Sequence, residues 1–211
     1  RSKNGKGGDE FAMMLAVFDL CGTLFRCNTL FAFARWACRR NFRCWLADSA
    51  PAKIVDMLFP RLRFRRRLFF SSIRRFDEKE LEYLSGVFCR DVLPRYARQS
   101  AFSLLVSLQE KGWTTVLVSS APDFLVKEVS RLFGFSEWRA STYQKGELIK
   151  DLTGNKLAAI RGFAPWELLF AVTDNRADLP LLRAADYRRI YCGRHKHWWI
   201  ARFPKDEVFE N

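Results

Sequence analysis

Three acidic residues stand where buried strands are expected to end, and their positions give the first indication of chemistry. Asp19 follows the apolar run Met13–Phe18, and Asp174 and Asp178 follow the apolar run Leu168–Thr173. A carboxylate at the end of a buried strand loses hydration, and this loss costs free energy unless a cation or hydrogen-bond donors contact the carboxylate. Carboxylate oxygens are ligands that Mg²⁺ prefers. The three acids therefore predict a divalent-cation site, provided that the fold brings them together.

Small polar residues and one lysine accompany the acids. Gly22 and Thr23 predict a tight loop after the first acid, with backbone amides that can approach an anion. Ser119 and Ser120 end another apolar run, and Lys156 follows a turn sequence at an expected helix start. Taken singly, such residues also fit ordinary roles as turn formers, helix caps or solvated lysines. Their coincidence with the acids is what indicates an anion-binding site beside the cation.

The elements that must position these residues alternate along the chain. Apolar runs predict buried strands at residues 13–18, 113–118 and 168–173, and a fourth strand is expected at residues 188–192. Helical patterns follow at residues 123–133, opened by Pro122 and closed by Gly134, and at residues 178–185. This alternation predicts an α/β fold with a Rossmann-like, mostly parallel sheet sandwiched by helices. Ligands of such sheets lie outside the carboxyl ends of the strands, where we expect Asp19, Ser119 and Asp174.

A long insertion separates the first predicted strand from the second. It lacks buried strand runs and is rich in Phe, Leu and Arg, which predicts a helical cap subdomain with helices at residues 29–40, 51–59, 63–76 and 78–98. Asp77 is placed to cap the last of these helices. The predicted organisation is a flexible tail at residues 1–10, a core at residues 11–25 and 101–211, and a helical cap at residues 26–100.

Net charge is concentrated in the predicted cap. The formal net charge is +13, and residues 26–100 hold 17 basic and 7 acidic residues. Residues 61–70, the densest basic stretch, fit a surface for anionic membrane or a set of arginines that binds a large anionic substrate. Nucleic acid is a weaker candidate, because the aromatic residues resemble a helix core more than a stacking platform. The fourth interpretation is solvated arginines on helices whose phenylalanines form the core of the cap.

Composition excludes several classes of protein. A chain of 211 residues with 49% hydrophobic content can bury a core, which argues against disorder. No uncharged run approaches the roughly 20 residues that a membrane-spanning helix needs. The six cysteines form no CxxC pair, which argues against a zinc site and a disulfide framework. We therefore expect a cytoplasmic location, with peripheral contact at a membrane surface if the cap binds lipid.

Four ordered motifs resemble those of the haloacid-dehalogenase-like (HAD) hydrolases. Residues 18–24, Phe-Asp-Leu-Cys-Gly-Thr-Leu, resemble the first motif, DxDGT, and residues 117–122 resemble the second, a Ser or Thr at a strand end. Residues 154–156 resemble the third motif, which supplies a lysine, and residues 173–180 are similar to the fourth, GDxxxD. The helical insertion directly after the first motif resembles the phosphoserine-phosphatase-like branch of this family.

The resemblance implies a role for each of the singled-out residues. It implies that Asp19 is a nucleophile that forms an aspartyl-phosphate, that Ser119 donates to a phosphoryl oxygen and that Lys156 stabilises the developing charge. The implied cofactor is Mg²⁺, with Asp19, the backbone carbonyl of Cys21, Asp174 and Asp178 as its ligands. The implied substrate is a phosphorylated small molecule or a lipid-linked phosphate, and the residues expected to bind it are Gly22, Thr23, Ser119, Ser120, Lys156 and Asn175.

Cys21 is the departure from the family pattern. The second aspartate of DxDGT protonates the leaving group and activates water in the family, and a thiol does this poorly because its ordinary pKa is around 8.5. Three functions stay open: a slow or specialised phosphohydrolase, a phosphotransferase or hydrolase that obtains the acid elsewhere, and a magnesium- and phosphate-binding interaction module without useful turnover.

Overall fold

The computed structural model describes residues 13–39, 41–144, 146–163, 165–192, 196–203 and 207–209 of the chain. The predicted tail at residues 1–10 lies outside the described residues. No helix within these ranges is long and apolar enough to cross a membrane.

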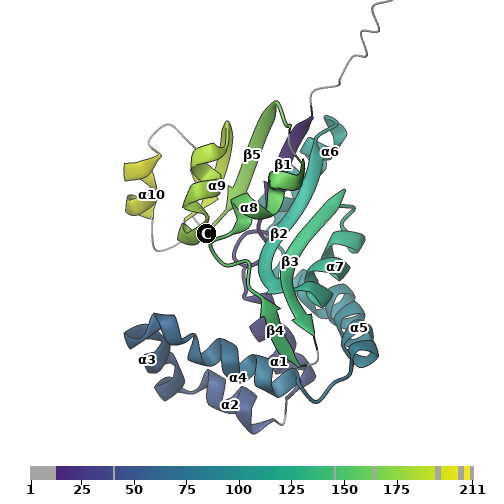
Figure 1. Cartoon of the computed structure of the whole chain (residues 1–211), viewed down its shortest axis with the longest axis vertical. Coiled ribbons are helices and arrows are strands. Elements are labelled where there is room, and N and C mark those ends of the chain that lie inside the picture. The colour runs from purple at the N-terminus through teal and green to yellow at the C-terminus, as the bar shows by residue number, and fades with distance from the viewer. Residues whose placement is uncertain are drawn as a thin grey trace, which may run out of the picture.

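A seven-stranded sheet forms the centre of the molecule (Figure 1). Its strands are β1 (Met14–Phe18), β2 (Thr114–Pro122), β3 (Glu137–Gln144), β4 (Glu147–Lys150), β5 (Leu168–Thr173), β6 (Tyr187–Tyr191) and β7 (Glu207–Phe209). The strand order is β4-β3-β2-β1-β5-β6-β7, and only the pairing of β3 with β4 is antiparallel. The predicted mostly parallel α/β sheet is confirmed. The central position of β1 places the end of this strand between the ends of β2 and β5.

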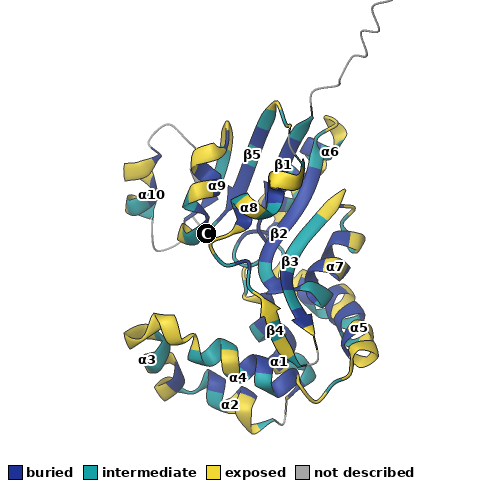
Figure 2. Cartoon of the chain, in the orientation of Figure 1, coloured by how far each residue is buried: buried dark blue, intermediate teal, exposed yellow. Residues whose placement is uncertain are grey.

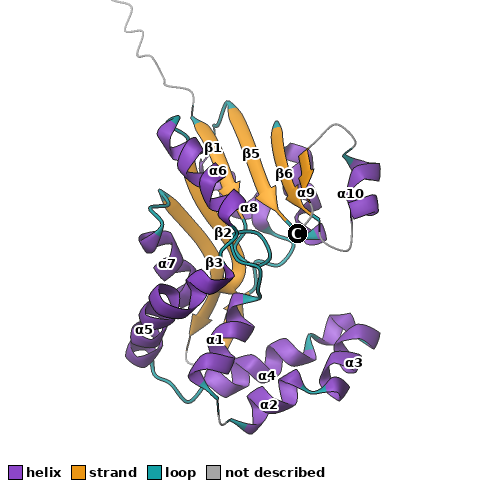
Figure 3. Cartoon of the chain, turned by 180° about the vertical axis from the view of Figure 1, so that it is seen from behind, coloured by secondary structure: helices purple, strands orange, loops and turns teal. Residues whose placement is uncertain are grey.

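Helices cover both faces of the sheet because both faces are apolar. Ala16 and Phe18 of β1 pack into one buried cluster, whereas Leu15 and Val17 pack into another. The first cluster takes side chains of α6 (Gln99–Glu110) and α7 (Asp123–Leu132). The second takes side chains of α8 (Lys156–Ile160), α9 (Leu179–Ala184) and α10 (Lys196–Arg202). Figure 1 shows α8 and α9 in front of the sheet, and Figure 3, from behind, shows α6 over the opposite face.

The insertion folds into helices, as predicted, but with different bounds. The observed helices are α1 (Thr29–Ala37), α2 (Phe42–Asp48), α3 (Ala50–Leu58), η1 (Pro60–Leu62), α4 (Phe64–Ile73), α5 (Glu78–Val87), η2 (Phe88–Val92) and η3 (Leu93–Tyr96). The capping role of Asp77 is confirmed, because its side chain accepts the Glu80 backbone N–H in a reciprocal capping box. The single helix predicted over residues 78–98 is wrong: after α5 the backbone passes through the π-turn η2 and the 3₁₀ turn η3.

Other elements were missed or given different bounds. The sequence patterns missed α2, α6, α10, β3, β4 and β7, and they ended the second strand at residue 118 although β2 continues to Pro122. Pro122 is the N-cap of α7 and not its first helical residue. The helix predicted over residues 178–185 starts as a 3₁₀ turn, η5 (Arg176–Asp178), before α9 begins.

The chain leaves and re-enters the core through two paired segments, residues 24–26 and 96–98, which we call the neck. The Arg26 N–H donates to Tyr96 O at 2.8 Å, and the Arg98 N–H donates to Leu24 O at 2.8 Å. Phe25 and Ala97 form an antiparallel bridge between these hydrogen bonds. The neck follows directly on the loop after β1, so the insertion is attached beside the expected site.

The helices of the insertion fall into two groups in space. Helices α1 to α4 lie together beyond the carboxyl end of β1, whereas α5 lies beside the core helix α7 (Figure 1). Lys127 of α7 forms an ion pair with Glu82 of α5 at 2.9 Å, and Leu81 and Phe88 are buried in the cluster that also contains Val126. The predicted boundaries of the cap at residues 26 and 100 stay a prediction.

Candidate active site

A cavity of about 390 Å³ opens at the carboxyl ends of β1, β2 and β5. Six of the predicted site residues line it: Asp19, Cys21, Gly22, Ser120, Asp174 and Asn175. The other four, Thr23, Ser119, Lys156 and Asp178, are buried close behind, at most 3% exposed. The structure therefore brings together residues from four separate segments of the chain, as the motif order predicts.

Asp19 is held by a backbone amide and by a buried lysine. Its Oδ1 accepts the Leu20 N–H at 2.7 Å and lies 2.6 Å from Lys156 Nζ. Both contacts fall on Oδ1, which leaves Oδ2 available to a reacting group or a cation. Lys156 reaches this point from the start of α8, and its side chain is only 2% exposed.

Asp178 fixes Lys156 from the other side. Its Oδ2 lies 2.7 Å from Lys156 Nζ and accepts the Thr173 hydroxyl at 2.6 Å. The buried Asp178 Oδ1 has no hydrogen-bond partner among the described residues. Asp178 does not line the cavity, so the structure places it where it orients Lys156. Its predicted role as a metal ligand stays a prediction.

Asp174 lies against the loop that follows β1. Its Oδ1 accepts the Thr23 hydroxyl at 3.2 Å. Gly22 has φ +77°, and a Cβ on this residue would lie 2.0 Å from Asp174 Oδ2. A side chain at position 22 would therefore displace Asp174, and the close approach of loop and carboxylate depends on glycine.

Burial and charge raise the pKa values of the two cavity carboxylates. Burial raises the pKa of Asp19 to about 6, with Lys156 acting in the opposite direction. Burial and the nearby Asp19 raise the pKa of Asp174 to about 7. The pKa of Lys156 is also raised, because the two carboxylates Asp19 and Asp178 outweigh the effect of its burial. The site thus holds the Lys156 ammonium beside Asp19 and Asp174, two carboxylates that repel each other.

Cys21 is a neutral thiol in this environment. Burial, followed by the charge of Asp19, raises its pKa to about 11. Its Sγ accepts the Thr29 N–H at 3.3 Å and lies 3.1 Å from Thr29 Oγ1 at the start of α1. The sulfur is therefore tied to the first helix of the insertion, and its raised pKa makes it a poor acid near neutral pH.

The two serines at the end of β2 have different environments. Ser120 lines the cavity, and its carbonyl accepts hydrogen bonds from Arg66 and Ser141, each at 2.9 Å. Ser119 is 1% exposed, and its Oγ accepts the Ala121 N–H at 3.2 Å. Donation from Ser119 to a phosphoryl oxygen stays a prediction.

Several residues at the site were missed at the sequence level. Arg98 is 3% exposed and donates to the carbonyls of Gly22 and Thr23 at 2.9 and 3.0 Å, which fixes the loop after β1. Arg26, from the neck, lines the cavity together with the α4 residue Arg66. An arginine that binds backbone carbonyls leaves no pattern in the sequence, so Arg98 could not be predicted. Arg66 lies in the basic stretch at residues 61–70, which the sequence indicated as a candidate surface for an anionic substrate.

The residues present fit Mg²⁺. Within the described ranges no group of three His, Cys, Asp or Glu side chains is arranged to hold a metal. Mg²⁺ commonly takes only one or two carboxylates and completes its coordination with water and substrate phosphate. Asp19 and Asp174 line one cavity, the charge of Asp19 raises the pKa of Asp174, and Gly22 leaves room beside Asp174. A hard cation between these carboxylates would remove their repulsion.

The chain is similar to known proteins in both sequence and fold. The family model for haloacid dehalogenase-like hydrolases matches residues 16–183. A protein of unknown function from Bordetella pertussis Tohama I is 19% identical with a TM-score of 0.72, over 94% of this chain and 98% of that one. A phosphoserine phosphohydrolase-like protein from Francisella tularensis subsp. tularensis SCHU S4 is 15% identical with a TM-score of 0.63, over 93% and 95% of the two chains.

A third structure is described as a phospho-aspartyl intermediate analogue of phosphoserine phosphatase. It is 16% identical with a TM-score of 0.60, over 93% of this chain and 92% of that one. At these identities the likeness shows the fold. No curated protein matches the chain significantly. The family resemblance predicted from the motifs is confirmed by the match over residues 16–183.

Proposed function

Because the chain belongs to the haloacid dehalogenase-like hydrolase family, we propose that it is a magnesium-dependent phosphohydrolase that acts through an aspartyl-phosphate on Asp19. The observation that carries this proposal is the state of Asp19. One of its oxygens is held by Lys156 and a backbone amide, whereas the carboxylate lines a cavity shared with Asp174. A nucleophile needs this combination of fixed orientation and access to substrate.

In the first step Asp19 Oδ2 attacks phosphorus, a new P–O bond forms, and the bond from phosphorus to the leaving oxygen breaks. Lys156 holds Oδ1 throughout and offsets the negative charge of the attacking group. Asp178 keeps the ammonium in place, and Thr173 in turn holds Asp178. In the second step water attacks phosphorus, the bond from phosphorus to Asp19 Oδ2 breaks, and the proton of the water passes to a phosphate oxygen or to solvent. Inorganic phosphate leaves and the Asp19 carboxylate is restored.

Asp19, Asp174 and the backbone carbonyl of Cys21 would hold the magnesium ion. Bound there, the cation would neutralise phosphate charge that otherwise repels the Asp19 carboxylate. The carbonyls of Gly22 and Thr23 are already bound to Arg98, whereas no described hydrogen bond uses the Cys21 carbonyl.

Cys21 sets the expected rate. With a pKa of about 11 the thiol neither protonates a leaving oxygen efficiently nor activates water. The other thiol of the cavity, Cys27, has its pKa raised to about 12, chiefly by burial. We therefore infer a slow or specialised enzyme whose substrate carries a good leaving group, such as an acyl phosphate. The second step lacks a base, so phosphorylated Asp19 should persist.

The missing base in the second step also supports an alternative function. A long-lived aspartyl-phosphate suits transfer to an acceptor other than water, and complete loss of turnover would leave a magnesium- and phosphate-binding module. A phosphotransferase would carry phosphate on Asp19 during turnover, whereas Asp19 of the binding module would never be phosphorylated.

The test compares wild type with Cys21→Asp, Cys21→Ala and Asp19→Asn in the presence of magnesium. Restoring the acid should raise hydrolysis of a simple aryl phosphate about 100-fold, because general acid–base catalysis contributes about 10²–10⁴-fold. Cys21→Ala should match wild type, and Asp19→Asn should be inactive. Mass spectrometry after incubation with acetyl phosphate should find phosphate on Asp19. If Cys21→Asp does not raise hydrolysis and no phosphate is found on Asp19, the hydrolase is excluded and the binding module is left.

A further inference from the structure

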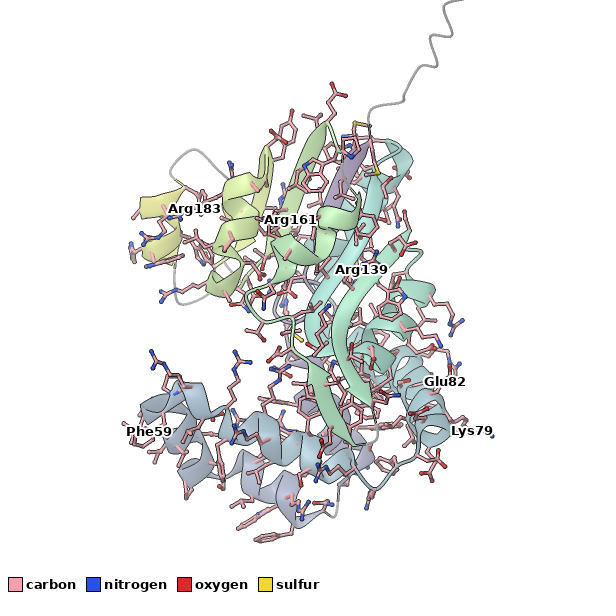
Figure 4. The ribbon with its side chains drawn as sticks, in the orientation of Figure 1. Phe59, Lys79, Glu82, Arg139, Arg161 and Arg183 are labelled. Atoms are coloured by element: carbon pink, nitrogen blue, oxygen red, sulfur yellow. The ribbon has the colours of Figure 1, made fainter. Side chains whose placement is uncertain are left out.

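Large apolar side chains are exposed at the outer end of the insertion. We call this set the apolar ridge, and its members are Ile54, Met57, Leu58, Phe59 and Leu62, between 47% and 72% exposed. They belong to α3, the residue after it, and η1. Figure 2 shows much of α3 and the following segment as exposed, and Figure 4 shows Phe59 at the end of the insertion away from α5. Neighbouring exposed apolar residues of this size mark an interaction site.

Helix geometry places three ridge residues on one face of α3. Ile54, Met57 and Leu58 have the spacing that places side chains on one face of a helix. Ala52, on the opposite face of α3, is 1% exposed and packs inward. Ala52 is the buried residue of α3, whereas the large apolar residues Ile54, Met57 and Leu58 face outward.

Positive charge borders the ridge. Residues 50–67 contain six basic residues and one acidic residue. Arg63, Arg65 and Arg66 form ion pairs with Asp151 or Asp48. Lys53, Arg61 and Arg67 are exposed and form no ion pair within the part of the chain that the structure describes. Asp56, the acidic residue of this segment, also forms no ion pair among the described residues, and its Oδ1 accepts the Arg65 N–H at 3.4 Å. The other three charges without an ion pair are positive.

This arrangement disfavours a second copy of the chain as the partner. A symmetric dimer brings the same patch of two subunits together, so it would place two patches of net positive charge against each other. An anionic bilayer offers instead an apolar layer for the ridge and phosphate groups for the cations.

We propose that the apolar ridge inserts into the headgroup region of an anionic lipid bilayer, with Lys53 and Arg61 bound to lipid phosphates. The docked side also borders the active site. Arg61 and Leu62 line a second cavity of about 810 Å³ between α4 and β4, and Arg66 lines both this cavity and that of Asp19. Docking does not depend on the proposed hydrolase function.

The test is co-sedimentation of the full chain with vesicles. One set contains phosphatidylcholine alone and the other contains equal amounts of phosphatidylcholine and phosphatidylglycerol. Wild type should bind the anionic vesicles at least tenfold more tightly than the neutral ones. Met57→Ser/Phe59→Ser should weaken binding at least tenfold, because both side chains leave the apolar layer. Arg61→Glu should weaken it at least fivefold.

Matched controls separate docking from general changes in polarity or charge. Tyr83→Ser/Val106→Ser removes two comparably exposed apolar side chains from α5 and α6, and Lys79→Glu reverses an exposed charge on α5. Both should bind like wild type, as should Asp19→Asn, which removes the proposed nucleophile. Figure 4 shows Lys79 and Phe59 at opposite sides of the molecule.

Three results would overturn the proposal. The first is equal binding to neutral and anionic vesicles, or none to either. The second is binding by the ridge variant that equals wild type. The third is a dimer in solution that the ridge variant abolishes while lipid binding is unchanged, because the ridge would then be a contact between copies.

Discussion

Gly22 shows how strictly one position in the site is constrained. We expect Gly22→Ala to lower hydrolysis at least 100-fold, because the new Cβ would lie 2.0 Å from Asp174 Oδ2 and must move that carboxylate. Gly154→Ala is the matched control, since Gly154 has a similar φ of +76° but open space for 4 Å around the point where a Cβ would lie. It should lose only about 1 kcal/mol of unfolding free energy from its backbone conformation and keep activity. Equal losses of activity in the two variants would contradict this explanation.

The raised pKa values of Asp19 and Asp174 predict how magnesium binding depends on pH. Protons compete with the cation for both carboxylates, whose pKa values are about 6 and about 7. The stabilisation by magnesium should therefore be small at pH 5 and grow as the pH rises through 6 and 7. Thermal unfolding with and without magnesium chloride measures it. Asp174→Asn should remove most of the gain, and a gain independent of pH would argue against this site.

At the level of single residues, the sequence predicted the members of the site that a motif or a strand end marks. Asp19, Asp174 and Lys156 are of this kind, and the structure brings them together. Arg98 could not be predicted, because it binds backbone carbonyls that every sequence contains. The poor acidity of Cys21 was expected from the ordinary pKa of a thiol, but the further rise of its pKa comes mainly from burial, which needs the structure.

Between elements, Asp151 connects α4 to the core beside β4. It accepts hydrogen bonds from Arg66 at 2.6 and 3.3 Å and forms an ion pair with Arg63. We expect Asp151→Asn to lower the free energy of unfolding by about 1–2 kcal/mol, because a partly buried charged hydrogen bond is lost. Denaturant unfolding measures the loss. Glu147→Gln, whose partner Arg74 is half exposed, should cost less than about 0.5 kcal/mol, and an equal cost for both variants would contradict the distinction.

The success of element prediction followed the strength of the pattern. The central strands β1 and β5 are apolar on both sides and were found, whereas β3 is polar and largely half-exposed and was missed. The end of the helical segment after α5 is marked in the sequence by a proline. Pro94 cannot donate a backbone hydrogen bond, so a helix through residue 98 would have been interrupted there.

For the whole molecule, the α/β class and the helical character of the insertion followed from alternation and composition. The position of α5 did not, because composition groups it with the arginine-rich helices although its buried face packs toward α7. Packing between helices depends on matching surfaces in three dimensions, which a linear pattern does not contain. The concentration of charge was visible in the sequence, but its division between paired and free arginines required the ion pairs of the structure.

The neck has a consequence for how such a chain can evolve. Its two segments are hydrogen-bonded to each other, so the insertion begins and ends at almost the same point. The part of the chain between the two segments of the neck could be exchanged for a longer, shorter or differently charged insertion. The core would pay little additional loop-closure entropy, because the ends of the insertion already lie together. Arg98 would still fix the loop after β1, because it lies on the core side of the exchange. The core and the insertion can thus change separately, and one core can acquire a different insertion by replacement of a single continuous segment.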